Sequence, residues 1–536
     1  MFEKIKKYIS HHKIEITLLI VILVIAAFFR IYKISDYMTF LGDEGRDAIV
    51  AKDILQGNFT LLGPRASAGD FFLGPIYYYM MAPFLFLSNL DPVGPAIMVA
   101  LFGVATVFLV YYVGRKFFNA RSGLIAASLY AISPLVIAYS RSSWNPNVMP
   151  FFSILMLYLL FVAVKKQTYK LFLIVGLLLG IAMQLHYLTT FLGVIVFFFM
   201  LIGEPLLEKK NLLKRYIYHY LEIFTGFIVG ISPFLAFEFR HGFPNITTIF
   251  KFIFEDNAAK GYNIHQSFLG NIWDVFFRLF GRLVTKFPPP DQINVGLHTN
   301  LQIWFVGTII LAVASIFALK YVKEKLKVLL LALWLLFGIL LFGFYKKSIY
   351  DYYLGFMFPV PFLLVGGLLN HLSELKKFKW MGIIAGVVFI VLVVINLSGN
   401  PFRYQGNKQR DQARRIAEAV LAQTDGKPFN FALLTKGNSD HVYRYFFEIE
   451  NRAPVTLENI IVDPERKSVT DQLMVVCEDQ ECHPLGNSLW EVSGFGRAEI
   501  TGEWSVPFVK IYRLVHYKEP EATPTPKVYN PPHATK

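Results

Sequence analysis

Two adjacent carboxylates, Asp43 and Glu44, follow about a dozen residues after the first long apolar run of the chain, residues 14–31. A carboxylate placed beside a membrane can accept a proton from an attacking group, so this pair is a candidate for general-base chemistry. The pair also precedes a helical pattern at residues 48–55, and acids are favourable at the start of any helix. From these residues alone, the catalytic and the helix-start interpretations both stay open.

The composition is that of a protein with many membrane spans. Of 536 residues, 55% are hydrophobic and 16% aromatic, and the mean hydropathy is +0.46, which is too apolar for a soluble multidomain protein. Runs long enough to cross about 30 Å of hydrocarbon recur along the first three quarters of the chain. They lie at residues 14–31, 93–113, 122–139, 148–164, 171–185, 187–202, 221–239, 301–319, 328–344, 354–369 and 381–397. We therefore predict a polytopic α-helical membrane protein with about 11 spans.

The lysines and arginines fall in alternate short loops, which orients the chain by the positive-inside rule. These clusters lie at residues 115–121, 165–170, 209–215, 320–327 and 376–379. A cytoplasmic N-terminus places four segments outside: residues 33–91, the loop that holds Arg141, the connection 240–300, and everything after Gly399. The net charge of +14 then reflects topology and contact with anionic membrane lipids, and no nucleic-acid partner is expected.

The composition changes after residue 399, where the long apolar runs stop. Short patterns replace them: a helix at 408–423, a strand at 429–434, a helix at 441–450, and strands at 473–477 and 509–515. We predict a multi-span catalytic domain over residues 1–399, a small extracytoplasmic α/β domain over 400–517, and a disordered Pro-rich tail over 518–536.

The two cysteines, Cys477 and Cys482, both fall in the region assigned to the outside. A disulfide and a free pair are both compatible with this spacing. The sequence contains no P-loop, no GxGxxG on a strand-to-helix turn, and no HExxH or CxxC metal pattern. Nucleotide-driven transport therefore has no motif here.

Several weak motifs occur in one order along the chain. They are Asp43-Glu44, Gly74-Pro75-Ile76-Tyr77-Tyr78, the turn Ser140-Arg141-Ser142-Ser143-Trp144, and Lys346-Lys347 followed by Tyr352-Tyr353, Pro359 and Pro361. In this order, over about 400 residues, the chain resembles bacterial members of the glycosyltransferase C superfamily. These are the family 39-like relatives of protein O-mannosyltransferases and of the aminoarabinose transferase of lipid A. Two departures stand out: Gly74 replaces the first proline of the usual pair, and the second outside loop has no carboxylate.

The resemblance implies an enzyme of the plasma (inner) membrane that moves a sugar from a polyprenyl-phosphate donor to an acceptor hydroxyl at the outer face, with inversion. Asp43 would act as general base and Glu44 would orient it. Arg141, Lys346 and Lys347 are unusual outside cations and are expected to bind the lipid phosphate, although snorkelling to lipid headgroups is an equally ordinary role. The acceptor is a protein, a glycan or a lipid.

Six further residues are expected along the substrate cavity: Arg46, Asp70, Tyr77, His186, Tyr352 and Tyr353. No cofactor is certain, and a divalent metal that bridges an acid to the phosphate stays an open possibility. An O-antigen-type polymerase, a lipid or solute transporter, and a receptor role for the outer domain are the alternatives. Transport is disfavoured because the predicted spans contain no obvious buried carboxylates and no half-to-half repeat.

Overall fold

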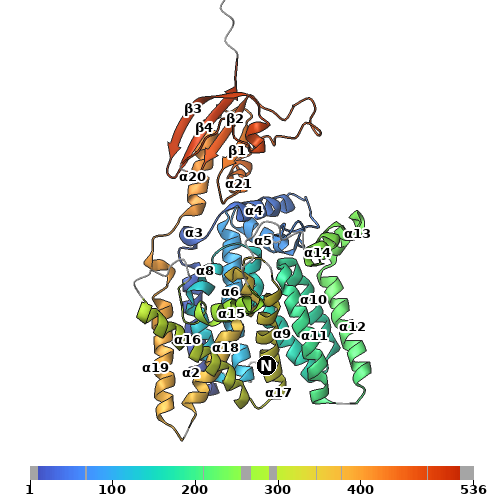
Figure 1. Ribbon diagram of the computed structural model, residues 1–536, viewed down its shortest axis with the longest axis vertical. Helices are drawn as coiled ribbons and strands as arrows, with labels where there is room; N and C mark the ends of the chain where they lie inside the picture. Colours follow the sequence, from blue (N-terminus) through green and yellow to red (C-terminus); the bar gives the residue numbers. More distant parts are fainter. Residues whose placement is uncertain are drawn as a thin grey trace, which may run out of the picture. The chain divides into compact units, whose positions relative to one another are not determined.

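The computed structural model describes residues 10–66, 69–208, 210–254, 267–288, 298–345, 347–375, 377–479 and 481–518. The chain divides into two compact units, Met1–Asp411 and Gln412–Lys536 (Figure 1). We call them the membrane unit and the C-terminal unit. Apart from Lys518, the predicted disordered tail lies outside the described residues.

The membrane unit is helical, as predicted. Its helices are α2 (Lys13–Ile31), α3 (Ile34–Tyr37), α4 (Gly42–Leu55), α5 (Ile76–Leu87), α6 (Val93–Phe117), α7 (Ala120–Ile132), α8 (Pro134–Tyr139), η1 (Asn145–Val148), α9 (Met149–Lys166), α10 (Tyr169–Leu185), η2 (Tyr187–Thr189), α11 (Thr190–Leu207), α12 (Leu212–Gly230), α13 (Ser232–His241), α14 (Pro244–Phe254), α15 (Phe268–Gly281), α16 (His298–Phe317), η5 (Ala318–Tyr321), α17 (Lys325–Leu340), η6 (Leu341–Phe344), η7 (Asp351–Met357), α18 (Pro359–Ser373), α19 (Trp380–Leu397) and η8 (Pro401–Arg403).

Within the described residues, seven helices are long and apolar enough to cross a membrane, or up to nine if each of two bent pairs counts as one span. The predicted spans at 122–139 and 171–185 fall on shorter apolar helices, α7 with α8 and α10. The structure thus confirms the polytopic fold class, and the count of 11 spans stays a prediction.

Prolines break three of the predicted spans. A new helix starts with Pro134, Ser232-Pro233 or Pro359, and the axes bend by 72° between α12 and α13 and by 58° between η7 and α18. Proline lacks a backbone N–H and suits the first helical turn, where that donor has no partner anyway. The predicted span over 221–239 therefore falls on a bent pair of helices, because α12 ends at Gly230 and α13 starts at Ser232.

Glycines bring α10 and α12 into backbone contact. A Cβ atom on Gly176 would lie 1.9 Å from the carbonyl oxygen of Ile223, and one on Gly226 would lie 2.0 Å from that of Leu173. Small residues at such contacts let helices in a membrane pack closely. The contact holds α10 in the bundle and so positions His186, which directly follows this helix.

One fully buried carboxylate lies near the end of a span. Glu204 of α11 accepts hydrogen bonds from Arg215 and Gln167 and lies 3.0 Å from Nδ1 of His219. The expectation that the spans hold no buried carboxylate is therefore wrong at Glu204 and also at Glu238 of α13, which is fully buried. Both carboxylate oxygens of Glu204 have partners on neighbouring segments. Glu204 therefore fits a role in linking helices better than a role in a permeation path.

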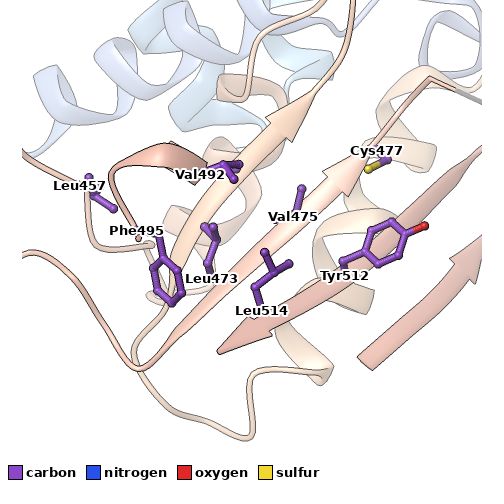
Figure 2. Packing of buried hydrophobic residues seen from close by; sticks show 9 residues of the cluster. Leu457, Leu473, Val475, Cys477, Val492, Phe495, Tyr512 and Leu514 are labelled. Atoms are coloured by element: carbon purple, nitrogen blue, oxygen red, sulfur yellow. The ribbon is translucent and has the colours of Figure 1, made fainter. Parts of the chain in front are cut away.

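The C-terminal unit contains a mixed four-stranded sheet in the order β1-β2-β4-β3, in which only the β1-β2 pair is parallel. Its elements are α20 (Gln409–Ala422, which starts in the membrane unit), β1 (Asn430–Leu434), α21 (His441–Ile449), β2 (Gln472–Cys477), α22 (Trp490–Ser493), β3 (Ala498–Val506) and β4 (Val509–His516). Leu473, Val475, Phe495 and Leu514 pack together on one side of this sheet (Figure 2). Sequence analysis missed β3, because this edge strand is mostly exposed and lacks a clear apolar alternation.

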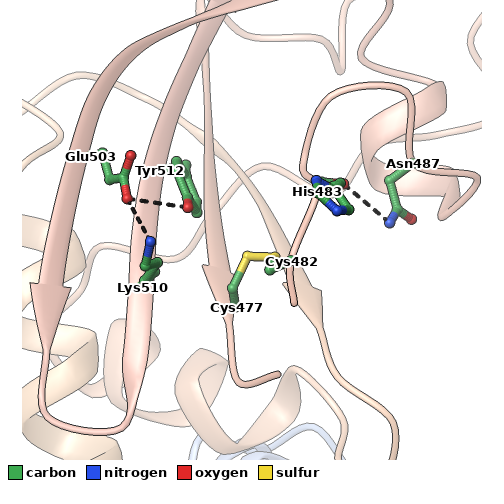
Figure 3. The surroundings of a disulfide bond; sticks show 7 residues. All are labelled: Cys477, Cys482, His483, Asn487, Glu503, Lys510 and Tyr512. Carbon is green, nitrogen blue, oxygen red and sulfur yellow. Dashed lines mark hydrogen bonds and ion pairs between the residues drawn. A yellow bond between two sulfur atoms is a disulfide. The ribbon is translucent and has the colours of Figure 1, made fainter. Parts of the chain in front are cut away.

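Cys477 and Cys482 form a disulfide with a Cα–Cα distance of 6.0 Å (Figure 3). Cys477 ends β2 and is buried in the sheet core, and Cys482 lies in the loop that follows. Of the two alternatives left open by the spacing, the structure shows the disulfide. On the neighbouring strands, Lys510 pairs with Glu503 at 2.9 Å.

Replacing Cys482 with serine should destabilise the C-terminal unit by about 2 kcal/mol, because the disulfide no longer restricts the unfolded chain over this short loop. We expect proteolysis within residues 412–518 of the intact, detergent-solubilised protein to begin at lower urea concentration. Dithiothreitol should shift wild type in the same way and leave Cys482→Ser unchanged. Equal urea midpoints for wild type and variant would contradict a stabilising disulfide.

Candidate active site

The acid pair starts α4, and its two members have different surroundings. The side chain of Glu44 accepts a hydrogen bond from the backbone N–H of Leu41 at 3.1 Å and from the hydroxyl of Thr39 at 2.5 Å. This contact is one half of a capping box, so Glu44 stabilises the first turn of the helix. Asp43 keeps 53% of its side chain exposed. The helix-start interpretation therefore describes Glu44, and Asp43 is the acid available for chemistry.

Arg46 connects Asp43 to a third acid, Asp47, on the same helix. One guanidinium nitrogen of Arg46 donates to Oδ1 of Asp43 at 2.9 Å, and another donates to Oδ1 of Asp47 at 2.7 Å. Asp47 is fully buried, and this burial raises the pKa of its carboxyl to about 7 although Arg46 opposes the shift. Arg46 is thereby held between a buried and an exposed carboxyl group.

Asp43 and Arg46 line a small cavity of about 50 Å³. The other lining residues are Pro64, Arg65, Ala66, Leu73, Trp144, Asn145, Pro146, His186, Tyr187 and Tyr352. Among the lining residues Asp43 is the only carboxylate. The cavity joins the segment between α2 and α5, the turn at residues 144–146, the start of η2 and the tyrosine segment of η7, so the structure brings together segments far apart in the sequence.

Aromatic rings form one wall of this cavity. The ring centroids of Trp144 and Tyr352 lie 4.3 Å apart, and His186 stacks on Tyr187 at 4.7 Å. Tyr353 packs behind them, 5.2 Å from His186. Burial lowers the pKa of His186 to about 3, so its ring is neutral at physiological pH. The wall is uncharged and faces an acid and two arginines.

Four of the residues predicted from the sequence thus meet at the cavity: Asp43, Arg46, His186 and Tyr352. Tyr77 was expected there as well, but its side chain is fully buried and its hydroxyl lies 2.9 Å from that of Ser143. Asp70 is mostly exposed and pairs with Arg65, a lining residue. Tyr77 is therefore a packing residue, and Asp70 reaches the cavity only through its partner.

The predicted phosphate ligands are not among the residues that line the cavity. Arg141 is 2% exposed, and its guanidinium donates to the carbonyl oxygens of Phe29 at 2.5 Å, Tyr32 at 3.0 Å and Lys33 at 3.2 Å. It binds the backbone at the end of α2, and its phosphate role stays a prediction. Lys346 lies outside the described residues, and Lys347 lies in the link between η6 and η7. The role of these two lysines stays a prediction.

Sequence analysis missed a charged cluster beside Tyr352. Asp351 is 7% exposed and pairs with Arg278 at 3.0 Å and Arg282 at 2.6 Å, and Arg278 also pairs with Asp274. The i, i+4 spacing of residues 274, 278 and 282 was the available signal, within a stretch of the 240–300 connection that forms α15. These pairs anchor α15 against η7, the element that carries Tyr352.

Within the part of the chain that the structure describes, no group of three or more His, Cys, Asp or Glu side chains could hold a metal ion. Asp43 is the one carboxylate of the cavity, and one of its oxygens already accepts a hydrogen bond from Arg46. The described cavity residues alone therefore do not form a metal-ligand set.

The comparisons with known proteins agree with this architecture. Residues 73–237 match the family model described as dolichyl-phosphate-mannose-protein mannosyltransferase. The structure of ArnT from Cupriavidus metallidurans bound to undecaprenyl phosphate is similar at a TM-score of 0.60 and 12% identity, over 94% of this chain and 98% of that one. The apo form of ArnT gives a TM-score of 0.58 at 12% identity, over 93% and 97%. A comparison with curated proteins finds no match.

The apo oligosaccharyltransferase of Archaeoglobus fulgidus is also similar, with a TM-score of 0.52 and 13% identity over 82% of this chain and 64% of that one. At these identities the structural likeness establishes the fold. The family match covers residues 73–237 of the 536, and the fold is that of a multi-pass helical membrane protein. The resemblance read from the sequence motifs is therefore confirmed at the level of the fold.

Replacing Asp47 with asparagine should change how stability depends on pH. The folded pKa of Asp47, about 7, lies above the value of about 3.9 for an unfolded chain, so the folded state holds the proton more tightly. Its stabilising contribution is complete below about pH 4 and is lost as the pH rises to about 7. Relative to Asp47→Asn, wild type should lose up to about 4 kcal/mol over this window and nothing further above it.

Thermal unfolding midpoints of the two proteins in detergent, measured from pH 5 to pH 8, test this expectation. A difference in midpoint that does not vary with pH would contradict the assignment of a proton to buried Asp47.

Proposed function

We propose that the protein is a membrane glycosyltransferase that moves a sugar from a polyprenyl-phosphate donor to an acceptor hydroxyl at the outer face of the plasma membrane. The observation that carries the proposal is the position of Asp43, the single carboxylate in an aromatic-walled cavity. The undecaprenyl phosphate bound by ArnT, a protein of the same fold, supports the donor class. The match of residues 73–237 to a mannosyltransferase family supports the reaction class.

In this proposal the reaction is a single displacement. The acceptor oxygen forms a bond to the anomeric carbon as the bond between that carbon and the phosphate oxygen breaks, and the phosphate leaves with the electron pair. The hydroxyl proton goes to Asp43, whose Oδ1 is held by Arg46 and whose Oδ2 has no hydrogen-bond partner among the described residues. Attack from the face opposite the phosphate inverts the anomeric centre, and no covalent nucleophile is needed.

The surroundings of Asp43 suit this role. Glu44 fixes the first turn of α4, so the position of Asp43 is set by the helix and not by a free loop. The aromatic wall of Trp144, Tyr187 and Tyr352 offers apolar faces that the C–H groups of a sugar ring can cover. Tyr352 follows Lys346 and Lys347 by a few residues, so we keep these lysines as phosphate contacts in the proposal.

The proposed sugar is a hexose or a pentose, and the acceptor is a hydroxyl of a protein, a glycan or a lipid. The proposed orientation has a cytoplasmic N-terminus and an extracytoplasmic C-terminal unit, because the lysine and arginine clusters fall in alternate short loops. Both cysteines are then on the oxidising side of the membrane, which fits their disulfide.

Replacing Asp43 with asparagine should reduce sugar transfer about a hundredfold to ten-thousandfold, because the amide cannot accept the acceptor proton. The assay is transfer of radiolabelled sugar from a panel of polyprenyl-phosphate donors by the purified protein. Asp53→Asn is the matched control, since Asp53 lies on the same helix but does not line the cavity.

Loss of transfer in Asp43→Asn with activity retained in Asp53→Asn supports Asp43 as the base. Full activity in Asp43→Asn would remove it from the mechanism. If wild type neither binds nor turns over any donor of the panel, the glycosyltransferase proposal itself fails.

The orientation is tested by labelling introduced cysteines with a membrane-impermeant maleimide. Tyr404 and Tyr169 are 73% and 55% exposed and fall on opposite sides of the membrane in the proposed topology. Tyr404→Cys should be labelled on intact cells, and Tyr169→Cys only after lysis. Wild type provides a low background, because Cys477 and Cys482 are joined in the disulfide. The reverse pattern would invert the topology.

A further inference from the structure

An open cavity of about 610 Å³ lies in the membrane unit, and Asp43 is not part of its lining. Its walls come from the segment between α2 and α4 and from the segment that links α19 to α20. The lining includes three cations, Lys33, Arg403 and Lys408, and one acid, Asp36. We call this site the basic cavity, since positive charge is in excess in its lining.

The cations of the basic cavity are not neutralised by the protein. No ion pair joins Lys33, Arg403 or Lys408 to an acid in the part of the chain that the structure describes. Arg403 donates a hydrogen bond to the carbonyl oxygen of Ser398 at 2.7 Å. Burial and the nearby charge of Arg403 lower the pKa of Lys286, so a fourth cation lies close to the cavity. An anionic ligand would neutralise this charge.

Hydrogen bonds join the two walls of the basic cavity. The hydroxyl of Tyr37 donates to the carbonyl oxygen of Tyr404 at 2.7 Å, and the backbone N–H of Lys408 donates to that of Asp36 at 2.9 Å. A Cβ atom on Gly406 would lie 2.6 Å from the same carbonyl oxygen of Asp36, so a larger residue would force the walls to shift. The cations are therefore attached to a braced frame and not to a free loop.

Lys33 and Lys408 share an unusual backbone conformation. Their φ angles are 49° and 50°, in the left-handed region that glycine and asparagine enter more readily than lysine. The turns alone would therefore favour another residue type at both positions. A lysine at each of them fits a role for the charge of its side chain.

The basic cavity follows the ends of two apolar helices that are long enough to cross a membrane. These are α2, which ends at Ile31, and α19, which ends at Leu397. Next to the cavity, the ring of Phe402 lies 5.5 Å from that of Phe28 and 5.4 Å from that of Tyr32. Aromatic side chains gather in this way at the level of the lipid headgroups, where the phosphate of a phospholipid lies.

Both helices also expose aliphatic side chains within their spans. Val24 of α2 is 63% exposed, and Val394 of α19 is 60% exposed. Such side chains contact acyl chains in a membrane, but they offer nothing to a free phosphate ion. A ligand that combines a phosphate with fatty chains therefore fits both the cavity and the helices that lead to it.

We propose that the basic cavity binds the headgroup of an anionic phospholipid. The phosphate would accept hydrogen bonds from Lys33, Arg403 and Lys408, and the acyl chains would lie along α2 and α19. This lipid is not a substrate, and the proposal does not rest on the proposed function. Because Arg403 and Lys408 belong to the link between α19 and α20, the bound headgroup would hold that link at the membrane.

The test measures how tightly the full-length protein in detergent binds phosphatidylglycerol and phosphatidylcholine of equal chain length, by native mass spectrometry. Wild type should prefer phosphatidylglycerol for the first molecule bound. Lys33→Asn, Lys408→Asn and Arg403→Gln should each weaken phosphatidylglycerol binding about fivefold, because each removes a cation beside an anionic headgroup, and should leave phosphatidylcholine unaffected. Asparagine suits the left-handed backbone at both lysine positions, so these two variants keep the fold.

Two further variants change the cavity in other ways. Asp36→Asn should strengthen phosphatidylglycerol binding, because it removes the acid that opposes the ligand. Gly406→Ala keeps every charge but displaces the walls, so it should weaken the binding. If Gly406→Ala does not give folded protein by size exclusion, the charge variants decide alone.

Arg240→Gln and Lys251→Gln are the matched controls, because both residues are exposed cations that do not line the cavity. They should bind phosphatidylglycerol as wild type does. Equal weakening in the controls and in the cavity variants would show a general attraction between charges and would overturn the site. Unchanged binding in all three cation variants of the cavity would overturn it as well.

Two competitors separate the phospholipid from other sources of phosphate. Glycerol phosphate should compete only at about a hundredfold higher concentration or more, because it lacks the acyl chains. Competition at equal concentration would overturn the assignment to a lipid. Binding of undecaprenyl phosphate should be the same in wild type and in Arg403→Gln, and a loss equal to that of phosphatidylglycerol would overturn the proposal of a separate lipid site.

Discussion

Three consecutive residues, Arg141, Ser142 and Ser143, hold the segments that flank α4, and the geometry of the candidate site depends on these contacts. The guanidinium of Arg141 binds the carbonyl oxygens at the end of α2, the hydroxyl of Ser142 accepts the backbone N–H of Thr39 at 3.1 Å, and the hydroxyl of Ser143 meets that of Tyr77. The chain that enters α4 is thus fixed before the helix begins. Asp43 then occupies a set position relative to Trp144, which follows these three residues directly.

Buried polar groups need hydrogen-bond partners. This requirement also explains how a more distant segment joins the site. Glu238 of α13 is fully buried and accepts hydrogen bonds from the side chain of Asn245 at 2.7 Å and from the backbone of Ile246. The side-chain oxygen of Asn245 in turn accepts the backbone N–H of Phe72 at 2.8 Å. A span that bends at a proline therefore reaches back to the first outside loop. Arg30 of α2 is unlike these groups, because two of its buried guanidinium nitrogens have no hydrogen-bond partner among the described residues.

The sequence contained enough information for the architecture and for part of the site. Apolar runs predict helices well, since in lipid a helix is one of the few structures in which every backbone N–H and C=O group has a hydrogen-bond partner. The acid pair and the tyrosines at 352 and 353 were found because residue type, order and sidedness all indicated the same outer surface. The two members of the acid pair differ by a capping contact, and that distinction required coordinates.

Two residues lie elsewhere than the sequence suggested, because a side chain can find its partners within the protein itself. Arg141 was expected at the phosphate because it is an outside cation, but its hydrogen-bond partners are carbonyl oxygens, which every residue carries and which no sequence motif marks. Tyr77 was expected at a cavity, and its helix turns it inward instead.

Asp43 and Asp47 are four residues apart on one helix, and they differ in how far their side chains are buried. Asp47 is withdrawn from water, so its carboxyl group can hold the guanidinium of Arg46 but cannot exchange protons readily with a substrate. Asp43 shares the same arginine but keeps half of its side chain exposed to the cavity. Identical residue types thus acquire different roles because their environments differ, which is how proteins separate a group that positions from a group that transfers a proton. Without Asp47, the exposed carboxylate of Asp43 would be the one ion-pair partner of Arg46 among the described residues.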